Sequence, residues 1–303
     1  MTKQSDELNS LHKEIVILNE HLSSQKGMYE MTTAYLKNIQ DELNLAKGKL
    51  EAINKDLTDS INYSKHIQDA FIVQIDKLRE MIPNSFMFQS PKNIVSGDFT
   101  WAFADGEEIY LGVGDCTGHG VPGAMLSIFV ISMLNEIISS NRDYNPAEIL
   151  THLDGLMFKY LTLYNATIRD SVEIAIIKLN LRKSKLTFAS AKRPIVIIRN
   201  GELTMTKGTK YLLGDPYKRN EELRNFEFDL EKGDLIFLYS DGFADQFGGQ
   251  NSTKFTNKRL LELLQSNSNL ELCNQFEEIK ETFYTHKGEN SQIDDVLLLG
   301  FQI

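Results

Sequence analysis

The first 82 residues contain no proline and carry an apolar residue about every 3.5 positions, which limits the fold more than any other feature of the chain. A single helix lying on a globular surface would drift off a strict seven-residue repeat over this length. The pattern therefore predicts a coiled-coil helix of about 90 Å between Leu8 and Ile67, at ~1.5 Å per residue. One row of heptad positions is apolar throughout, at Leu8, Ile15, Leu22, Tyr29, Leu36, Leu43, Leu50 and Leu57. The second row is apolar at Leu11, Leu18, Ile39, Ala46 and Ile53 and polar at Gln25 and Thr32.

Such a helix cannot bury its apolar stripe alone. The favoured partner is a second copy of the chain, which gives a parallel homodimer through residues 8–81. The alternative is an antiparallel hairpin that turns near Lys26-Gly27 or Lys47-Gly48. Ser60 and Ser64 form two polar layers near the end of the repeat, and polar layers weaken a coiled-coil seam. They indicate either a switch that controls the following domain or a frayed helix end.

Pro83-Asn84 ends the helical pattern. It divides the chain into a coiled-coil dimerisation and signalling helix, residues 1–82, and one mixed domain, residues 83–303. Asp105-Gly106 and Asn200-Gly201 are hairpin signals within this domain. Strands in meandering runs with helices grouped between them predict an α+β domain of antiparallel sheets with helices outside. The expected strands are 94–104, 108–114, 172–181, 185–190, 194–199, 202–206, 234–240 and 296–303, and the expected helices are 122–139, 146–164, 257–266 and 270–284.

Composition limits the function classes. Apolar residues make up 42% of the 303 residues, enough for a substantial core, and the formal net charge of −10 disfavours nucleic-acid binding. The two cysteines, Cys116 and Cys273, are typical of a reduced compartment. The N-terminus does not read as a signal peptide, and the apolar run 121–138 contains Pro122 and several polar residues. We therefore expect a cytoplasmic protein with no membrane insertion and no nucleic-acid partner.

Four aspartates stand at predicted strand ends, next to a glycine or another aspartate: Asp98, Asp115, Asp241 and Asp294. Each alone is ordinary turn chemistry. Together they predict one oxygen-rich site, since carboxylates are the ligands that Mg²⁺ and Mn²⁺ prefer. Each pair of like charges at ~4 Å costs about 4 kcal/mol at an effective dielectric of about 20, which two divalent ions would offset. The pattern favours a two-metal hydrolase acting on a phosphate ester.

The four motifs also carry a family resemblance. In chain order they are SGDF (96–99), DCTGHGVPGAMLS (115–127), YSDG (239–242) with DQFGG (245–249), and DDV (294–296). This order resembles the metal-dependent, type 2C (PPM) protein phosphatases, and most of all their bacterial branch typified by SpoIIE and RsbU. The resemblance covers residues 84–303 and implies a β-sandwich of two antiparallel sheets flanked by helices. It further implies hydrolysis of phosphoserine or phosphothreonine by a metal-activated water, with two Mn²⁺ or Mg²⁺ ions.

By motif position, the resemblance assigns the catalytic and metal-binding roles. The residues are Asp98, Asp115, Asp241 and Asp294, with the backbone carbonyl of Cys116 as a further metal ligand and Asp295 in a supporting role. Two departures concern substrate fit. Thr100 stands where many relatives carry an acidic residue, and Ala189-Ser190-Ala191-Lys192 replaces an Ala-Gly-Ala type of turn.

Three other groups lie in or near these motifs. His119 lies four residues after Asp115 rather than two, so a structural turn role is favoured over protonation of the leaving oxygen. Lys192 and Arg193 read as a solvated basic pair, with contact to a phosphoprotein as the alternative. Cys116 has no adjacent histidine base, which disfavours a cysteine phosphatase.

The resulting prediction is a protein serine/threonine phosphatase. The resemblance implies a phosphorylated STAS-domain anti-anti-sigma factor as substrate, in bacterial partner-switching signalling. One alternative is a non-catalytic phosphatase-fold adaptor that the coiled coil dimerises. A nucleotidyl cyclase, indicated only by the loop 96–99, is disfavoured because that loop lacks a glutamate and the other three motifs remain unexplained.

Overall fold

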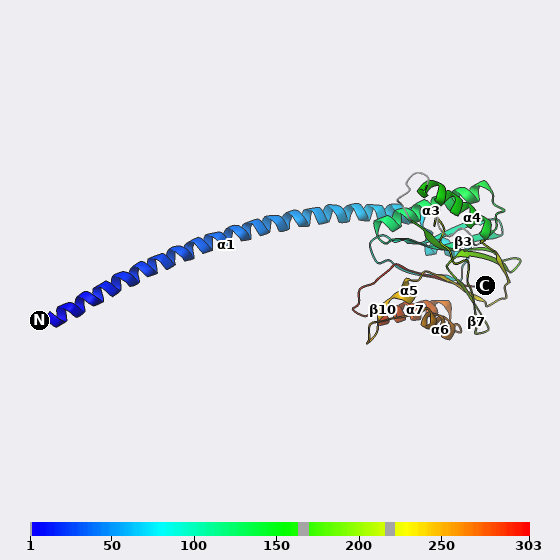
Figure 1. The fold of residues 1–303 in the computed structure, drawn as a ribbon. Coiled ribbons are helices and arrows are strands. Elements are labelled where there is room, and N and C mark those ends of the chain that lie inside the picture. The colour runs from blue at the N-terminus through cyan, green and yellow to red at the C-terminus, as the bar shows by residue number, and fades with distance from the viewer. Residues whose placement is uncertain (1, 163–169, 216–221) are drawn as a thin grey trace. The chain divides into compact units, whose positions relative to one another are not determined.

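The computed structural model describes residues 2–162, 170–215 and 222–303, which form two compact units, residues 1–60 and 61–303. Helix α1 (Thr2–Phe71) makes up the first unit and continues into the second. The functional boundary that the sequence places between residues 82 and 83 stays a prediction. The second unit holds every strand of the described chain (Figure 1).

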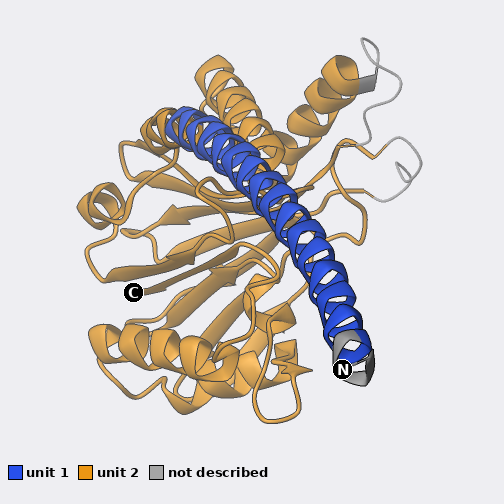
Figure 2. Cartoon of the chain, turned by 90° about the vertical axis from the view of Figure 1, so that its left-hand side faces the viewer, with its two compact units in different colours: residues 1–60 blue, residues 61–303 orange. Residues whose placement is uncertain are grey.

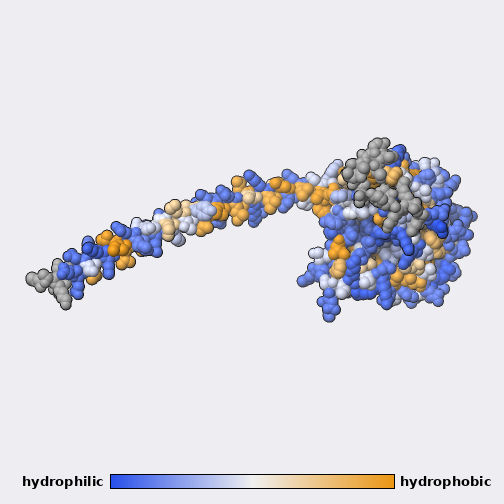
Figure 3. Space-filling view, in the orientation of Figure 1, coloured by the Kyte–Doolittle hydropathy of each residue, from blue (hydrophilic) through white to orange (hydrophobic). Residues whose placement is uncertain are grey.

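The predicted long helix is confirmed, and α1 continues through Gly27 and Gly48, so neither hairpin turn forms. Its apolar heptad residues are exposed in this single chain, for example Leu22 at 67% and Leu36 at 59%. Orange patches of apolar side chains follow the helix in Figure 3. The sequence predicts a helical pattern that continues up to Pro83, and this prediction is wrong at one point. The helix breaks after Phe71, and a short helix, α2 (Ile75–Met81), follows. The break has a local cause, because the Val73 amide donates to the Thr100 carbonyl at 3.1 Å and leaves the helix.

Two five-stranded antiparallel sheets form the centre of the second unit (Figure 2). The first sheet runs in the order β1 (Ser85–Ser90), β12 (Val296–Gln302), β9 (Leu235–Tyr239), β6 (Ile195–Arg199) and β7 (Glu202–Thr206). The second runs in the order β2 (Asp98–Asp105), β3 (Glu108–Cys116), β4 (Val172–Asn180), β5 (Lys185–Ala191) and β8 (Phe226–Asp229). A small hairpin joins β10 (Phe247–Gly248) and β11 (Thr253–Lys254).

Helices cover the outer face of each sheet. Helices α3 (Val121–Ser140) and α4 (Pro146–Met157), the latter followed by a π-helical turn η1 (Phe158–Thr162), pack on the second sheet. Helices α6 (Asn257–Ser266) and α7 (Leu272–Lys287) pack on the first, and α5 (Gly242–Asp245) follows β9. A third apolar cluster fills the space between the sheets, with Leu111, Ile236 and Leu299 among its members. The predicted α+β sandwich of antiparallel sheets is therefore confirmed.

Helix α3 contains the apolar run 121–138, for which the sequence predicts no membrane insertion. Among the described helices it alone has the length and apolar character needed to cross a membrane. Its Leu134 and Ile138 are fully buried in the cluster that also contains Trp101 and Ile176 of the second sheet. The helix therefore packs as a core element of this domain.

Strand register brings the acidic residues to one end of the sandwich. The hairpin at Gly106 aligns β2 and β3 so that Asp98 lies directly across from Asp115. In the other sheet, β9 and β12 are neighbours, so the residues after β9 and those before β12 meet at the same end. The approach is close, because a Cβ added at Gly242 would lie 1.9 Å from the Asp295 carbonyl oxygen.

Candidate metal centre

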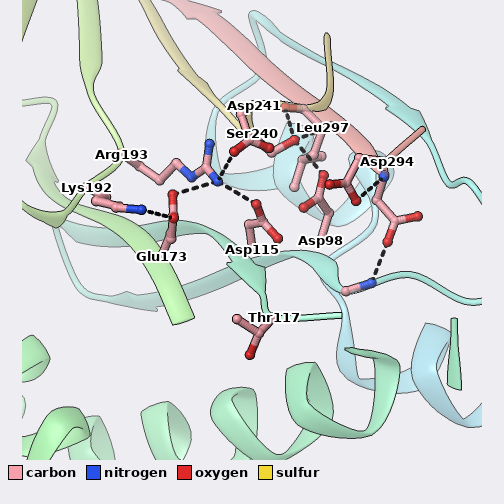
Figure 4. Close-up of polar contacts among 12 residues, drawn as sticks. Asp98, Asp115, Thr117, Glu173, Lys192, Arg193, Ser240, Asp241, Asp294 and Leu297 are labelled. Carbon is pink, nitrogen blue, oxygen red and sulfur yellow. Dashed lines mark hydrogen bonds and ion pairs between the residues drawn. The ribbon is translucent and has the colours of Figure 1, made fainter. Parts of the chain in front are cut away.

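Asp98 is the most deeply buried acidic residue of the site, with 1% of its surface exposed. Its Oδ2 accepts a hydrogen bond from the Ser240 hydroxyl at 2.5 Å, and the Ser240 Oγ in turn accepts from the Leu297 amide at 2.9 Å. Ser240 follows β9 and Leu297 belongs to β12, so this chain of contacts joins the two sheets beneath the site (Figure 4).

Above Asp98, a cavity of about 250 Å³ opens to the surface. Three of the four predicted aspartates line it: Asp115, Asp241 and Asp294. Its remaining walls come from Glu173, from Cys116 at the end of β3, and from Thr117, Gly118 and His119 in the loop that follows. The structure thus gathers at one end of the sandwich the four aspartates singled out from the sequence, with Asp98 below and the other three around the opening.

Burial and mutual repulsion shape the ionisation of these carboxyls. Burial, followed by the charge of Asp115, raises the pKa of Asp98 well above its usual value. Burial also raises the pKa of Asp115 to about 7, although Arg193 lowers it; Asp241 and Asp294 raise it further. Burial is the first cause that raises the pKa of Asp294 as well. These carboxyls therefore resist ionisation, first because they are buried and also because they repel one another.

Glu173 is a member of this site that the sequence analysis missed. It lies on β4 directly across from Asp115. One oxygen each of Asp115, Glu173 and Asp241 lies within 4.8 Å of the other two. The available signal was an acidic residue at the start of a mostly apolar strand that pairs with β3, the strand that carries Asp115.

Arg193 was misjudged as a solvated residue, and this expectation is wrong. Its side chain is 6% exposed, and its Nη2 lies 2.5 Å from Asp115 Oδ2, 2.7 Å from Glu173 Oε2 and 3.0 Å from Asp241 Oδ2. Lys192 is the more exposed of the pair and contacts Glu173 at 2.8 Å. Figure 4 shows the guanidinium pointing into the carboxylate cluster.

Asp295 holds the loop that leads to Asp98. Its Oδ1 accepts from the Lys92 amide and its Oδ2 from the Gly97 amide, each at 2.7 Å. A side chain at Gly97 would not fit, because its Cβ would lie 2.8 Å from the Gly118 carbonyl oxygen. Asp295 is 3% exposed, and its carboxylate holds two backbone amides of this loop, which is a supporting role of the kind expected for it.

The other predicted groups have clear positions. The Cys116 thiol is buried, and burial, followed by the charge of Asp115, raises its pKa well above the usual value, which suits an inert thiol rather than a nucleophile. His119 is exposed at the cavity wall, with Nδ1 3.0 Å from Asn93 Oδ1. Thr100 is buried and its hydroxyl contacts Met87 Sδ at 3.2 Å, so it does not take an acidic residue's place in the cavity.

The donor set suits a hard divalent cation. The three groups whose oxygens lie within 4.8 Å of one another, Asp115, Glu173 and Asp241, are all carboxylates, and oxygen-only sites select Mg²⁺, Ca²⁺ or Mn²⁺ over softer metals. The raised pKa values of Asp98, Asp115 and Asp294 are the electrostatic consequence of carboxyls gathered in partly buried positions. A divalent ion would relieve that repulsion, so the residues present fit such a group.

Comparison with known proteins agrees with the geometry. The family model described as Stage II sporulation protein E (SpoIIE) matches residues 105–303. The phosphoserine phosphatase RsbU of Bacillus subtilis is 24% identical over 160 residues, which cover 51% of this chain and 44% of RsbU. The chain therefore spans less than half the length of this curated relative.

Solved structures show the same architecture. The SiaA-PP2C domain of Pseudomonas aeruginosa matches with a TM-score of 0.76 and 28% identity, over 83% of this chain and 99% of that one. RsbX, solved in complex with magnesium, matches with a TM-score of 0.51 and 17% identity, over 72% of this chain and 94% of that one, and shows the fold alone. Because the family model covers well over half of the chain and the fold agrees, the chain belongs to the SpoIIE family, in the RsbU-like branch of the PPM protein serine/threonine phosphatases.

Proposed function

We propose that this chain hydrolyses phosphoserine or phosphothreonine in a protein substrate, with two divalent ions, Mn²⁺ or Mg²⁺, held by Asp98, Asp115, Asp241, Asp294 and the Cys116 carbonyl. The observation that carries the proposal is the meeting of carboxylates from both sheets around one open cavity. The fold neighbour RsbX was solved with magnesium, which supports a hard cation. We add Glu173 to the residues that face this cavity.

Each residue has a distinct task in this proposal. Bound ions would supply a water that ionises near neutral pH and positive charge for the phosphoryl oxygens. Asp115 lies across from the buried Asp98 in the register of β2 and β3 and also lines the open cavity. Asp98 is fixed by Ser240 below it, and Asp241 and Asp294 bound the opening through which a phosphorylated side chain enters. Asp295 keeps the loop before Asp98 in place.

The direct test is hydrolysis of p-nitrophenyl phosphate by the purified chain with Mn²⁺. We expect activity that a chelator abolishes, and Asp241→Asn should lower kcat by about a hundredfold or more because a ligand of the metal site is lost. Asp245→Asn is the matched control, since Asp245 ends the short helix α5 that Asp241 precedes, and it pairs with Lys254 rather than lining the cavity. Equal activity of Asp241→Asn and the unaltered chain would refute the site assignment.

The remaining candidate function is a non-catalytic adaptor that uses the same fold to bind a partner. Titration calorimetry separates the two, since an adaptor would take up no Mn²⁺ while staying folded. The crowded carboxyls favour the enzyme, because an adaptor gains nothing from keeping them together at an energetic cost.

For the substrate we propose a phosphorylated STAS-domain anti-anti-sigma factor, acted on in the cytoplasm within a partner-switching pathway. The match to RsbU, whose name is that of a phosphoserine phosphatase, supports the substrate class. Phosphate release from a phosphorylated STAS protein, compared with a phosphoserine peptide of the same local sequence, tests the assignment. No preference for the folded STAS protein would contradict it. We also propose that α1 forms a parallel homodimer through residues 8–81.

A further inference from the structure

The guanidinium of Arg193 occupies the place where a cation is needed. Its Nη2 makes contacts of 2.5–3.0 Å with three carboxylates, those of Asp115, Glu173 and Asp241, which are also the residues whose oxygens come within metal-binding distance of one another. Burial opposes the charge, but the neighbouring carboxylates outweigh it and raise the pKa of Arg193. One positive charge is thus placed among several negative ones.

The guanidinium donors of Arg193 are unevenly used: Nη2 donates hydrogen bonds to Asp115 and Asp241. Its Nε is buried and has no hydrogen-bond partner among the described residues. A guanidinium in a permanent structural socket normally has its donors satisfied, because a buried unpaired donor costs about 1–3 kcal/mol. Here one nitrogen carries all three carboxylate contacts and another carries none, which is the mark of a group that another cation can replace.

The backbone that carries Arg193 is fixed independently of its side chain. The Arg193 amide donates to the Ala191 carbonyl at 2.9 Å, and the Ser190 hydroxyl donates to the Arg193 carbonyl. Lys192, at φ 66°, completes this turn between β5 and β6. The side chain can therefore leave the cluster, or be replaced, without loss of the turn.

We propose that Arg193 is an internal counter-cation of the acidic centre, and that a divalent ion binds by displacing its guanidinium from Asp115, Glu173 and Asp241. This inference rests on the proposed metal dependence. The guanidinium stabilises the metal-free protein by offsetting carboxylate repulsion, and for the same reason it competes with the metal. The residue thereby sets the metal concentration at which the site fills.

The test is calorimetric titration of Mn²⁺ into the full chain after chelator treatment. Arg193→Gln should bind Mn²⁺ about tenfold more tightly than the unaltered chain, because no cation has to leave. Arg193→Lys, which keeps the charge, should stay much closer to the unaltered chain. Lys192→Gln is the matched control: it removes the same charge from the next residue, which contacts only the outer side of Glu173, and should change the affinity far less.

The Tm of thermal unfolding, measured in chelator and again with Mn²⁺, provides a second test. Arg193→Gln should have a lower Tm than the unaltered chain without metal and recover most of the difference at saturating Mn²⁺. An unchanged or weaker Mn²⁺ affinity in Arg193→Gln would overturn the inference while leaving the proposed function intact. If neither the unaltered chain nor Arg193→Gln takes up Mn²⁺, the proposed metal dependence fails and the inference fails with it.

Discussion

Asp234 shows how a buried carboxylate is stabilised away from the candidate metal centre. It is 1% exposed and lies just before β9. Its Oδ1 accepts from Arg199 Nε at 2.8 Å, and its Oδ2 accepts from Arg199 Nη2 at 2.6 Å and from the Glu231 amide at 2.8 Å. Burial alone would raise the pKa of Asp234, but these hydrogen bonds outweigh it and hold the pKa below its usual value.

This arrangement predicts an acid-sensitive contribution to stability. A carboxyl whose pKa is lower in the folded protein stabilises it fully above the unfolded pKa, near 4, and loses that contribution as the pH falls through the folded pKa. Asp234→Asn should lower the free energy of unfolding by about 1–3 kcal/mol at pH 7. Urea unfolding from pH 7 to pH 3 measures both proteins, and the gap between them should narrow below about pH 4. A gap that stays constant would contradict the assigned pKa shift.

Individual site residues were predictable to different degrees. The four aspartates could be predicted because each lies in a short motif that contains glycine or a second aspartate, and such motifs are visible in the local sequence. They are Asp98, Asp115, Asp241 and Asp294. Glu173 has no such motif; it reaches the site only through the register of β3 and β4, which pairs residues far apart in the chain. Arg193 is likewise buried by carboxylates from distant segments of the chain, and the basic pair Lys192-Arg193 in the sequence gives no sign of them.

At the scale of elements, the end of α1 is tied to the loop before Asp98. The Gln68 side chain is fully buried. Its Nε2 donates to the Ser96 carbonyl at 2.6 Å and to the Ser127 hydroxyl at 3.0 Å, and its Oε1 accepts from the Ser96 amide at 3.2 Å. The Ser96 hydroxyl then accepts from the Asp98 amide at 3.0 Å. A shift of this helix end would therefore reach the candidate metal centre through two residues.

Gln68→Leu should weaken both stability and activity. Loss of these contacts leaves Ser96 and Ser127 without their partner, which should lower the free energy of unfolding by about 1–3 kcal/mol. Phosphatase activity should fall further than this loss of stability explains, because the loop that carries Asp98 loses its support. Gln40→Leu, the same change at an exposed position of α1, is the control. Gln68→Leu with normal activity and altered stability alone would limit Gln68 to a structural role.

Most elements follow from local pattern, and the exceptions have physical causes. Strong hairpin and proline signals place β2, β3, β6, β7 and α3 within a few residues of expectation. Strand β8 went unpredicted because its residues Phe226–Asp229 are mostly exposed at a sheet edge and lack a buried alternation. Strand β1 begins at Ser85, right after the helix stop signal Pro83-Asn84, and went unpredicted for that reason. Residues 163 and 164 of the expected helix 146–164 lie outside the described residues.

At the scale of the whole molecule, the acidic residues come together because two sheets meet at one end. The contact between Ser240 and Asp98 crosses between the sheets, and Asp295 joins the start of β12 to the loop before β2. Neither link is visible in a single sequence segment. The order of the four motifs, however, predicts the whole fold through the type 2C resemblance. That resemblance indicates which distant segments lie together, which the spacing of apolar residues does not.

The apolar row along α1 supports the last prediction, a parallel dimer. Leu36 and Leu43 are 59% and 66% exposed in the single chain, and a helix with such a row is stable in water only when another helix covers it. Leu36→Glu/Leu43→Glu should convert a dimer to a monomer, measured by light scattering after gel filtration. Asn38→Glu/Asn44→Glu adds the same charges on the outer face of the helix, away from the two apolar rows, and should leave the dimer intact. A monomeric unaltered chain at micromolar concentration would refute the dimer.

Orientation needs a separate measurement. In a parallel pair the two copies of residue 22 face each other, whereas in an antiparallel pair they lie far apart along the helix. Leu22→Cys, made together with Cys273→Ser to remove the exposed native thiol, should form an intermolecular disulfide rapidly under mild oxidation. The buried Cys116 serves as the internal control, because it should stay reduced in the folded protein. Failure to cross-link in a chain that is nonetheless dimeric would establish the antiparallel arrangement and place the two phosphatase domains at opposite ends of the coiled coil.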